Sequence, residues 1–244
     1  MVTFSIKSLQ HPKVKECVSI RTQAKIRRHL GLALIIGHKM VSELAPLNTL
    51  IIRSDLDPSH YPPATTTYVV TDSILKKITG LQQPEGVSAL IPLPTPTQLD
   101  CHTNILVLDH ISDPGNLGTL LRTALGLGFD GAYLINCVDP FNDKALRASM
   151  GAAFKLPVQF GQTADFLSFL QQASFTGVAA TLNGSALQGF KKPSKMALII
   201  GNESHGIDPA IQKICQCVTI PLEPSIESLN AAVAGGILLY ALAP

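Results

Sequence analysis

From residue 104 onward, the chain alternates short apolar runs with stretches in which apolar residues recur at helical spacing. A run that is apolar at nearly every position is typical of a strand covered on both faces, as in a parallel sheet. Alternation of such strands with helices predicts an α/β fold with a mostly parallel, six-stranded sheet. The six predicted strands cover residues 105–108, 132–135, 157–160, 177–182, 196–200 and 217–220.

Capping residues indicate where the helices between these strands begin. Asp113-Pro114 predicts a helix start, with the carboxylate as N-cap and proline in the first turn, and this helix ends near Gly128. Ser228 is the predicted N-cap of a last helix that is apolar on every side. Further helices are predicted over residues 144–153 and 164–172.

The N-terminal part shows a second α/β pattern of roughly ninety residues, the usual size of a small domain. Its predicted helices cover residues 11–30, 39–44 and 74–78, the last capped by Asp72 or Ser73, and its predicted strands cover residues 32–36, 50–52, 68–70 and 87–91. A Pro/Thr-rich run over residues 92–97 predicts an extended linker. We therefore expect one domain at residues 1–91, a linker at 92–103 and a second domain at 104–244.

Composition excludes several classes of protein. With 46% hydrophobic and 15% charged residues, the 244-residue chain has the profile of a globular, core-rich protein. Its five cysteines form no CxxC pair, so neither a disulfide framework nor a zinc site is favoured, and we expect no metal. The N-terminus lacks an apolar signal core, and the longest apolar run, residues 231–243, is too short to span a bilayer. We expect a cytoplasmic protein with no membrane partner.

Charge is distributed unevenly along the chain. Residues 1–39 carry eight Lys or Arg against one acid, Glu16, whereas the rest carries eleven basic and sixteen acidic residues. This asymmetry predicts a polyanionic partner, although a solvated helix face would explain it equally well. Because aromatic residues are few, we expect shape and phosphate contacts to dominate the binding if that partner is RNA. The candidate cations are Lys13, Lys15, Arg21, Lys25, Arg27 and Arg28.

The first candidate site segment follows the strand predicted at 105–108. Gly115 and Gly118 let the backbone approach a ligand closely, and Asn116 and Arg122 add polar side chains six residues apart. Alternatively, Asn116 satisfies the helix end and Arg122 pairs with a surface acid. The segment is not a dinucleotide fingerprint or a P-loop, because GxGxxG is missing after the first strand and GxxxxGK[ST] occurs nowhere.

Two further polar segments follow later strands. Glu203 lies in the glycine-flanked loop 201–206, which is either a plain turn or a place where its carboxylate meets an arginine or a ligand. Ser228 and Asn230 lie between apolar runs, and a capped core helix explains Ser228 fully but Asn230 poorly. Because the carboxyl ends of parallel strands open into a crevice, all three segments are candidate parts of one ligand site.

In this order, the three segments resemble the motifs of the SpoU/TrmH family of RNA 2′-O-ribose methyltransferases in the SPOUT superfamily. The matches are DPGNLGTLLRTA (113–124), LIIGNESHGI (198–207) and IPLEPSIESLNAAVAGGILL (220–239), with RASMGAAFKLPV (147–158) also similar. Residues 1–91 are similar to the family's ribosomal-protein-like RNA-binding domain. The chain departs from the family pattern at Ile36, where relatives often carry Glu, and at Ala232, where a second serine is usual.

The resemblance implies S-adenosylmethionine-dependent methylation of a ribose 2′-hydroxyl in structured RNA, with ribosomal RNA favoured over transfer RNA. It implies a deep trefoil knot in the C-terminal sheet, and a homodimer in which the partner chain completes each active site. Main-chain groups of Gly201, Ile220 and Leu229 would hold the cofactor.

The resemblance also assigns roles to side chains. Arg122 would accept the hydroxyl proton or, as we prefer, stabilise the developing alkoxide, because a free guanidinium holds its proton too tightly to be a base near pH 7. Asn116 and Glu203 would orient Arg122, while Ser228 and Asn230 would order the cofactor loop and the target ribose. The alternatives are a non-catalytic RNA-binding or ribosome-assembly factor on the same fold and, less favoured, a nucleotide-dependent oxidoreductase.

Overall fold

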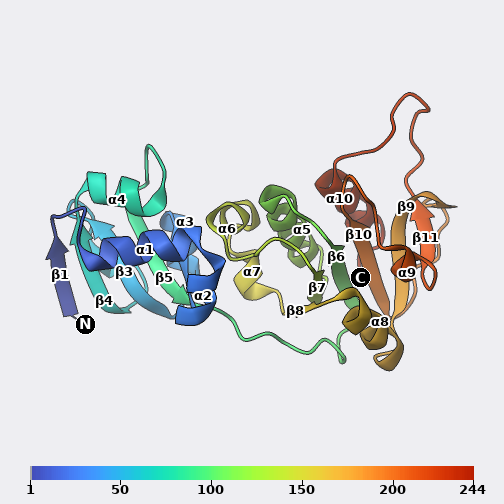
Figure 1. Ribbon diagram of the computed structural model, residues 1–244, viewed down its shortest axis with the longest axis horizontal. Coiled ribbons are helices and arrows are strands. Elements are labelled where there is room, and N and C mark those ends of the chain that lie inside the picture. The colour runs from blue at the N-terminus through green and yellow to red at the C-terminus, as the bar shows by residue number, and fades with distance from the viewer. Residues whose placement is uncertain (1) are drawn as a thin grey trace. The chain divides into compact units, whose positions relative to one another are not determined.

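A computed structural model describes residues 2–244, and the chain divides into two units (Figure 1). Unit 1 contains the chain up to Pro94 together with residues 141–154, and unit 2 contains residues 95–140 and 155–244. Unit 1 therefore includes a segment that the sequence places in the middle of the predicted second domain.

The predicted parallel sheet is present in unit 2. Six strands lie in the order β11-β9-β10-β6-β7-β8, and every neighbouring pair is parallel. This confirms the predicted fold class, and each observed strand overlaps one predicted strand. The strands are β6 (Asn104–Asp109), β7 (Gly131–Ile135), β8 (Val158–Gly161), β9 (Thr176–Ala186), β10 (Met196–Gly201) and β11 (Gln216–Thr219).

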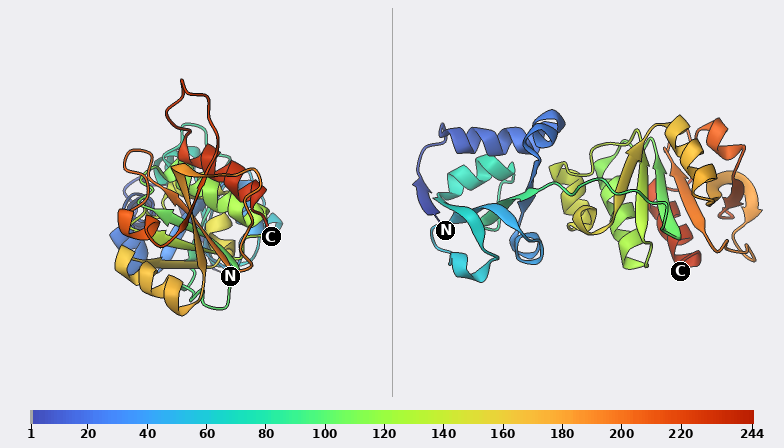
Figure 2. Two further views of the ribbon diagram at one scale, coloured as in Figure 1. Left: turned by 90° about the vertical axis from the view of Figure 1, so that its right-hand side faces the viewer. Right: turned by 90° about the horizontal axis from the view of Figure 1, so that it is seen from below.

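Helices cover both faces of this sheet, which explains why its strands are apolar throughout. On one face lie α5 (Pro114–Gly126) and α10 (Ala231–Ala241), and on the other lie α8 (Thr163–Gln172) and α9 (Pro209–Gln212) (Figure 2). The face under α8 and α9 contains an aromatic cluster in which the rings of Tyr133, Phe166 and Phe169 pack with centroids 5.0 to 6.4 Å apart.

Unit 1 is built on a mixed five-stranded sheet with the order β1-β4-β3-β5-β2. Its strands are β1 (Val2–Ile6), β2 (Leu32–Ile36), β3 (Leu47–Arg53), β4 (Ala64–Val70) and β5 (Val87–Pro92). Its helices are α1 (Pro12–Thr22), α2 (Ala24–Leu30), α3 (His38–Glu43), α4 (Asp72–Thr79) and α6 (Asp143–Ser149), with the 3₁₀ turn η1 (Pro58–His60). The short helix α7 (Ala152–Lys155) follows α6.

Two predicted helices are each divided in the structure. The helix expected over residues 11–30 breaks at Gln23, which has an extended conformation, and the buried Arg27 guanidinium bonds to the carbonyls of Ile20 and Arg21 at the end of α1. The helix expected over 144–153 breaks into α6 and α7, because Met150 and Gly151 take left-handed conformations.

Other expectations at element ends were also wrong. Strand β1 was not predicted, because it is an edge strand exposed at four of its five positions and shows no buried apolar run. Thr71, rather than Asp72 or Ser73, is the N-cap of α4. None of the helices within residues 2–244 combines the length and apolar character needed to cross a membrane.

Gly235 controls the packing of α10 against α5. A Cβ atom at Gly235 would lie 2.3 Å from Cδ2 of the fully buried Leu120, whereas one at Gly126 would meet nothing within 4 Å. Gly235→Val should lower the free energy of unfolding by about 1–3 kcal/mol through overpacking. Gly126→Ala should leave it unchanged or raise it by up to about 1 kcal/mol. Urea denaturation of both variants measures this, and equal stabilities would contradict the packing described.

Candidate active site and cofactor pocket

A pocket of about 480 Å³ opens at the carboxyl ends of β9, β10 and β11. Such a volume is typical of sites for drug-sized molecules and cofactors. The three predicted cofactor-binding positions, Gly201, Ile220 and Leu229, all line it, and so do the side chains of Glu203 and Ser228. The pocket therefore collects residues from the second and third predicted segments.

A tight hairpin after β10 forms one wall of this pocket. The backbone amides of Asn202 and Gly206 each bond to the other residue's carbonyl, at 3.1 and 2.9 Å. A Cβ atom on Gly201 would lie 2.4 Å from the carbonyl carbon of Gly206, which is backbone and cannot move aside. Only glycine fits at position 201, and the turn places Glu203 near its tip.

Three polar side chains from the three segments form a hydrogen-bonded chain beside the pocket. The Asn116 side-chain amide donates to the Glu203 carboxylate. The Asn116 carbonyl oxygen accepts from the Asn230 amide at 3.1 Å. Asn116 and Asn230 are 114 residues apart in sequence, so only the fold brings them together. Of the predicted catalytic residues, these three are in direct contact.

The start of α10 differs from its prediction. Asn230, not Ser228, is the N-cap, and its side-chain oxygen accepts from the amides of Ala232 and Val233 at 2.9 and 3.2 Å. Asn230 thus lies one residue before the helix rather than in its first turn. In this position, its side-chain amide is free to donate to Asn116. Ser228 is exposed and contributes to the pocket wall.

Arg122 lies apart from this cluster. It is exposed on α5, six residues after Asn116, which places it about 9 Å further along the helix axis and on a different side. Within residues 2–244, Arg122 forms no hydrogen bond or ion pair. The single chain therefore assembles Asn116, Glu203 and Asn230 but does not bring Arg122 to them.

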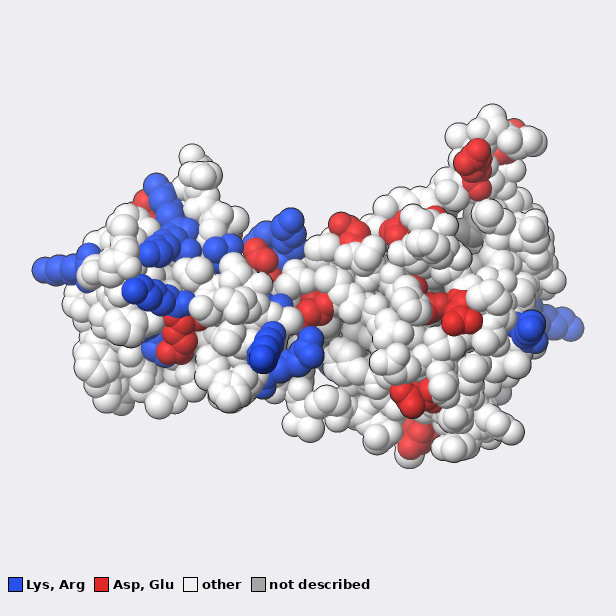
Figure 3. Space-filling model, viewed as in Figure 1, with Lys and Arg blue, Asp and Glu red and all other residues white. Residues whose placement is uncertain are grey.

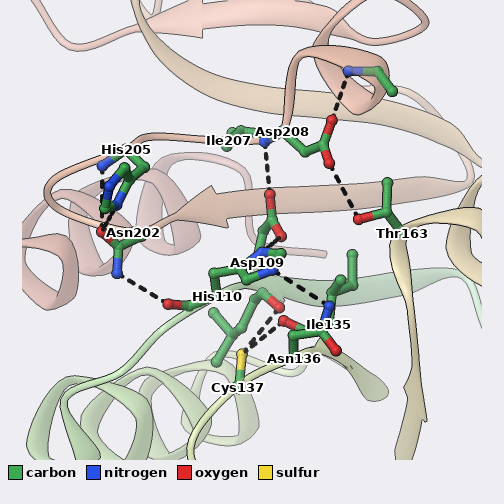
Figure 4. Close-up of polar contacts among 12 residues, drawn as sticks. Asp109, His110, Ile135, Asn136, Cys137, Thr163, Asn202, His205, Ile207 and Asp208 are labelled. Carbon is green, nitrogen blue, oxygen red and sulfur yellow. Dashed lines mark hydrogen bonds and ion pairs between the residues drawn. The ribbon is translucent and has the colours of Figure 1, made fainter.

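A buried carboxylate, missed by sequence reasoning, fixes the hairpin to the sheet (Figure 4). Asp109 ends β6, is fully buried and pairs in register with Gly201 of β10. One carboxylate oxygen accepts from the Asp208 amide at 2.7 Å, and the other lies 2.6 Å from Nδ1 of His110. The Asn202 side chain donates to the His110 carbonyl at 3.0 Å, so the two ends of the loop 202–208 are held by Asp109 and by the residue that follows β6.

Neighbouring backbone supports this arrangement. His110 and Asn136, which follow β6 and β7, both take the left-handed conformation that non-glycine residues seldom adopt, and their side chains lie 3.3 Å apart. The nearby Cys137 thiol contacts the Leu108 carbonyl at 3.2 Å, and burial raises the pKa of this thiol to about 12. A thiol with so high a pKa stays protonated at neutral pH and is a structural group here.

The predicted RNA-binding cations are not equivalent. Lys15, Lys25 and Arg28 are exposed, Lys13 pairs with Glu16 at 2.7 Å, and Arg21 is half-buried against Gly80. Arg27 is buried and holds the end of α1, so it is not part of an accessible surface. In Figure 3, Lys and Arg side chains predominate over unit 1 and Asp and Glu over unit 2.

The pocket fits S-adenosylmethionine in three respects. At Gly201, the pocket wall is bare backbone with no side chain in the way, so a cofactor can contact main-chain groups directly. Among the lining residues, Thr181 has a buried hydroxyl oxygen with no partner in the described part of the chain. Apolar groups of Ile200, Leu222 and Leu238 alternate with polar ones around the pocket. No group of three or more His, Cys, Asp or Glu within residues 2–244 could hold a metal ion.

Known proteins resemble this chain in fold and in sequence over nearly its full length. Residues 103–240 match the model described as the SpoU rRNA Methylase family. The 23S rRNA (guanosine(2553)-2'-O)-methyltransferase RlmP of Bacillus subtilis is 31% identical over 248 aligned residues, covering 97% of this chain and 98% of the relative. The AdoMet-bound rRNA methyltransferase from Sinorhizobium meliloti, 27% identical, superposes with a TM-score of 0.88 and covers 98% of this chain and 97% of its own.

Fold, pocket and similarity together define the class of protein: an enzyme that methylates a ribose 2′-hydroxyl of RNA with S-adenosylmethionine. The chain belongs to the SpoU rRNA methylase family. The predicted family, cofactor and enzymatic class are confirmed, and the non-catalytic alternative is not supported.

Substituting the buried Asp109 tests whether this carboxylate holds the loop 202–208 in place beside the pocket. Asp109→Ala leaves the Asp208 amide without its partner and should lower the free energy of unfolding by about 1–3 kcal/mol. Because the loop 202–208 then loosens, affinity for S-adenosylmethionine should fall as well. Asp109→Asn keeps one acceptor oxygen and should lose less of both.

Denaturation and titration calorimetry measure the two effects, with the exposed Asp100→Asn as control. Unchanged cofactor affinity in Asp109→Ala would contradict the supporting role of Asp109.

Proposed function

We propose that this enzyme methylates ribosomal RNA, acting as a cytoplasmic homodimer with a knotted C-terminal sheet. The observation that carries the enzymatic assignment is the contact of Asn116, Glu203 and Asn230 beside a pocket that fits the cofactor. The preference for ribosomal over transfer RNA rests on the near full-length similarity to RlmP, whose name specifies 23S rRNA.

The proposed chemistry needs positioning more than covalent participation. When bound, S-adenosylmethionine supplies a methyl group activated by a positively charged sulfonium. As the O–C bond forms and the S–C bond breaks to leave a neutral thioether, the hydroxyl proton would pass to water. The chain must hold the ribose hydroxyl in line with that methyl group and stabilise the oxygen as this proton leaves. Asn116 is suited to positioning, because its amide is fixed from both sides by Glu203 and Asn230. Main-chain groups at Gly201, Ile220 and Leu229 would hold the cofactor, and Ser228 would order the third segment.

Arg122 is proposed to act in the active site of the partner subunit. Its exposure and its separation from Asn116 argue against a role within its own chain. In a two-fold dimer, each α5 would present its guanidinium to the neighbouring pocket. There it would contact the phosphate and stabilise the developing alkoxide, since a charged guanidinium is a strong electrostatic partner but a poor base.

The apolar last helix supports both the dimer and the knot. Val233, Ile237 and Tyr240 are spaced along one side of α10 and are 52%, 39% and 77% exposed, although the chain is otherwise core-rich. A large exposed apolar patch is typical of an interface between chains. In addition, α10 follows the edge strand β11 yet packs on α5 and β10 in the middle of the sheet, as a chain end threaded through a knot would.

Unit 1 is proposed to bind the RNA. Lys15, Lys25 and Arg28 are exposed and would contact phosphates, which position RNA without reading its sequence. Arg27 is left out of this surface because it is buried.

The role of Arg122 is open to a direct test. Arg122→Ala should abolish methyl transfer from labelled S-adenosylmethionine to rRNA and leave cofactor affinity nearly unchanged, because the pocket does not include Arg122. The exposed Lys213→Ala is the control. Wild-type turnover by Arg122→Ala would refute the assignment. Transfer to tRNA but not to rRNA by the wild type would refute the proposed substrate.

Mixing subunits tests the shared active site. Neither Arg122→Ala nor Glu203→Ala should be active alone, but a mixed dimer would contain one complete site if Arg122 serves its partner. Random mixing should restore about a quarter of wild-type activity, as half of the dimers are mixed and each has one working site of two. No recovery would place both residues in the same chain's site.

The proposed role of the exposed side of α10 as a dimer interface can be tested by measuring the oligomeric state. Val233→Glu should convert a dimer into a monomer, because burying an unpaired carboxylate in an apolar interface is costly. Light scattering measures the mass, and Ile214→Glu, which is also at an exposed apolar position but outside α10, should remain dimeric. A wild-type monomer in solution would overturn the proposed dimer.

A further inference from the structure

A stacked pair of aromatic side chains lies at the edge of the sheet in unit 1. Phe4 of β1 and Tyr68 of β4 are direct neighbours in the parallel ladder. Their rings stack with centroids 5.6 Å apart and planes inclined by 24°. Tyr68 packs against the core cluster beneath α1 and α4, whereas Phe4 is 50% exposed. One face of the Phe4 side chain is thus supported by Tyr68 and the remainder is open.

Phe4 lies beyond the part of the sheet that helices α1 and α4 cover. The next pair on the same side of the two strands, Ile6 and Val70, is buried in the core cluster with α1 and α4. The helical layer therefore stops before Phe4, and Val2, which precedes it on the same side, is also exposed. Large apolar side chains on an exposed edge strand favour unwanted association and usually mark an interaction site.

Lysines lie on the elements next to this pair. The Lys13 ammonium lies 5.8 Å from the centroid of the Tyr68 ring. Lys7, directly after β1, and Lys15, in the first turns of α1, are exposed. A ligand that suits both features carries flat apolar rings and negative charge along one backbone, which describes unpaired nucleotides. An apolar protein partner would match the rings but not the lysines.

We propose that Phe4 is a stacking surface for an unpaired base of the RNA substrate, with the exposed Lys7 and Lys15 contacting the flanking phosphates. This inference rests on the proposed binding of RNA by unit 1 and makes it more specific. It also modifies the expectation that shape and phosphate contacts alone dominate, since a stacked base requires a single-stranded region in the target.

The sequence contains no tryptophan, which allows a direct test in the full-length protein. Phe4→Trp introduces a single indole at the proposed contact, and Phe160→Trp introduces one at a control position. Phe160 is 45% exposed and lies on β8, the edge strand of the other sheet. Titration with a short RNA hairpin that has a single-stranded loop should quench Phe4→Trp fluorescence saturably and leave Phe160→Trp unchanged. A fully paired duplex of equal length should quench neither.

Affinity measurements on tryptophan-free variants complete the test. Phe4→Ala should bind the looped hairpin roughly five- to hundredfold more weakly, the usual effect of losing one base–aromatic stack. Phe4→Tyr should restore binding, and Phe160→Ala should match the wild type. The slope of affinity against salt should be unchanged in Phe4→Ala but reduced in Lys15→Gln, because only the lysine contacts phosphate.

Three results would overturn the inference, and they separate it from the proposed function. If the looped hairpin binds but does not affect Phe4→Trp, RNA binding stands and stacking on Phe4 is wrong. If Phe4→Ala lowers the mass measured by light scattering, the pair is a contact between copies of the chain. If the wild type binds neither RNA, the proposed role of unit 1 fails together with the inference.

Discussion

The parallel arrangement of the six-stranded sheet is the constraint on which the active site depends. Because all neighbouring strands run in the same direction, the loops that follow β6, β9, β10 and β11 leave the sheet at one edge. The register places Asp109 opposite Gly201, so the first and second segments begin side by side. The contact of Asn116 with Glu203, across 87 residues of sequence, is a direct consequence.

Much of this fold could be predicted from the sequence, for a physical reason. Strands covered on both faces are apolar throughout, and this is a strong local signal even in a run as short as that of β7. The N-cap at Asp113 was also predictable, because an aspartate directly before a proline is a common helix start. In the structure, its carboxylate accepts from the backbone amide of Asn116 at 2.8 Å.

Features set by distant contacts could not be predicted. The break at Gln23 depends on Arg27 reaching back to α1, and Arg27 looks like any other surface cation in the sequence. Either Ser228 or Asn230 is an acceptable N-cap, and the choice of Asn230 follows from its bond to Asn116, 114 residues away. Asp109 carried a weak signal as an acid ending a buried strand, but its partner Asp208 is known only from the fold.

The path of the chain between β7 and β8 has a consequence for how the protein can be divided. In the sequence, residues 141–154 lie between two parts of unit 2, but in the structure they belong to unit 1. There, α6 packs on β2, and Gly151 lies against Leu44. The buried side chains of Ala145 and Leu146 belong to the interior of unit 1. A truncated protein that starts at the Pro/Thr-rich run would expose them to water. No single cut in the polypeptide therefore yields two intact halves, and loss of the N-terminal part would also disturb the methyltransferase sequence.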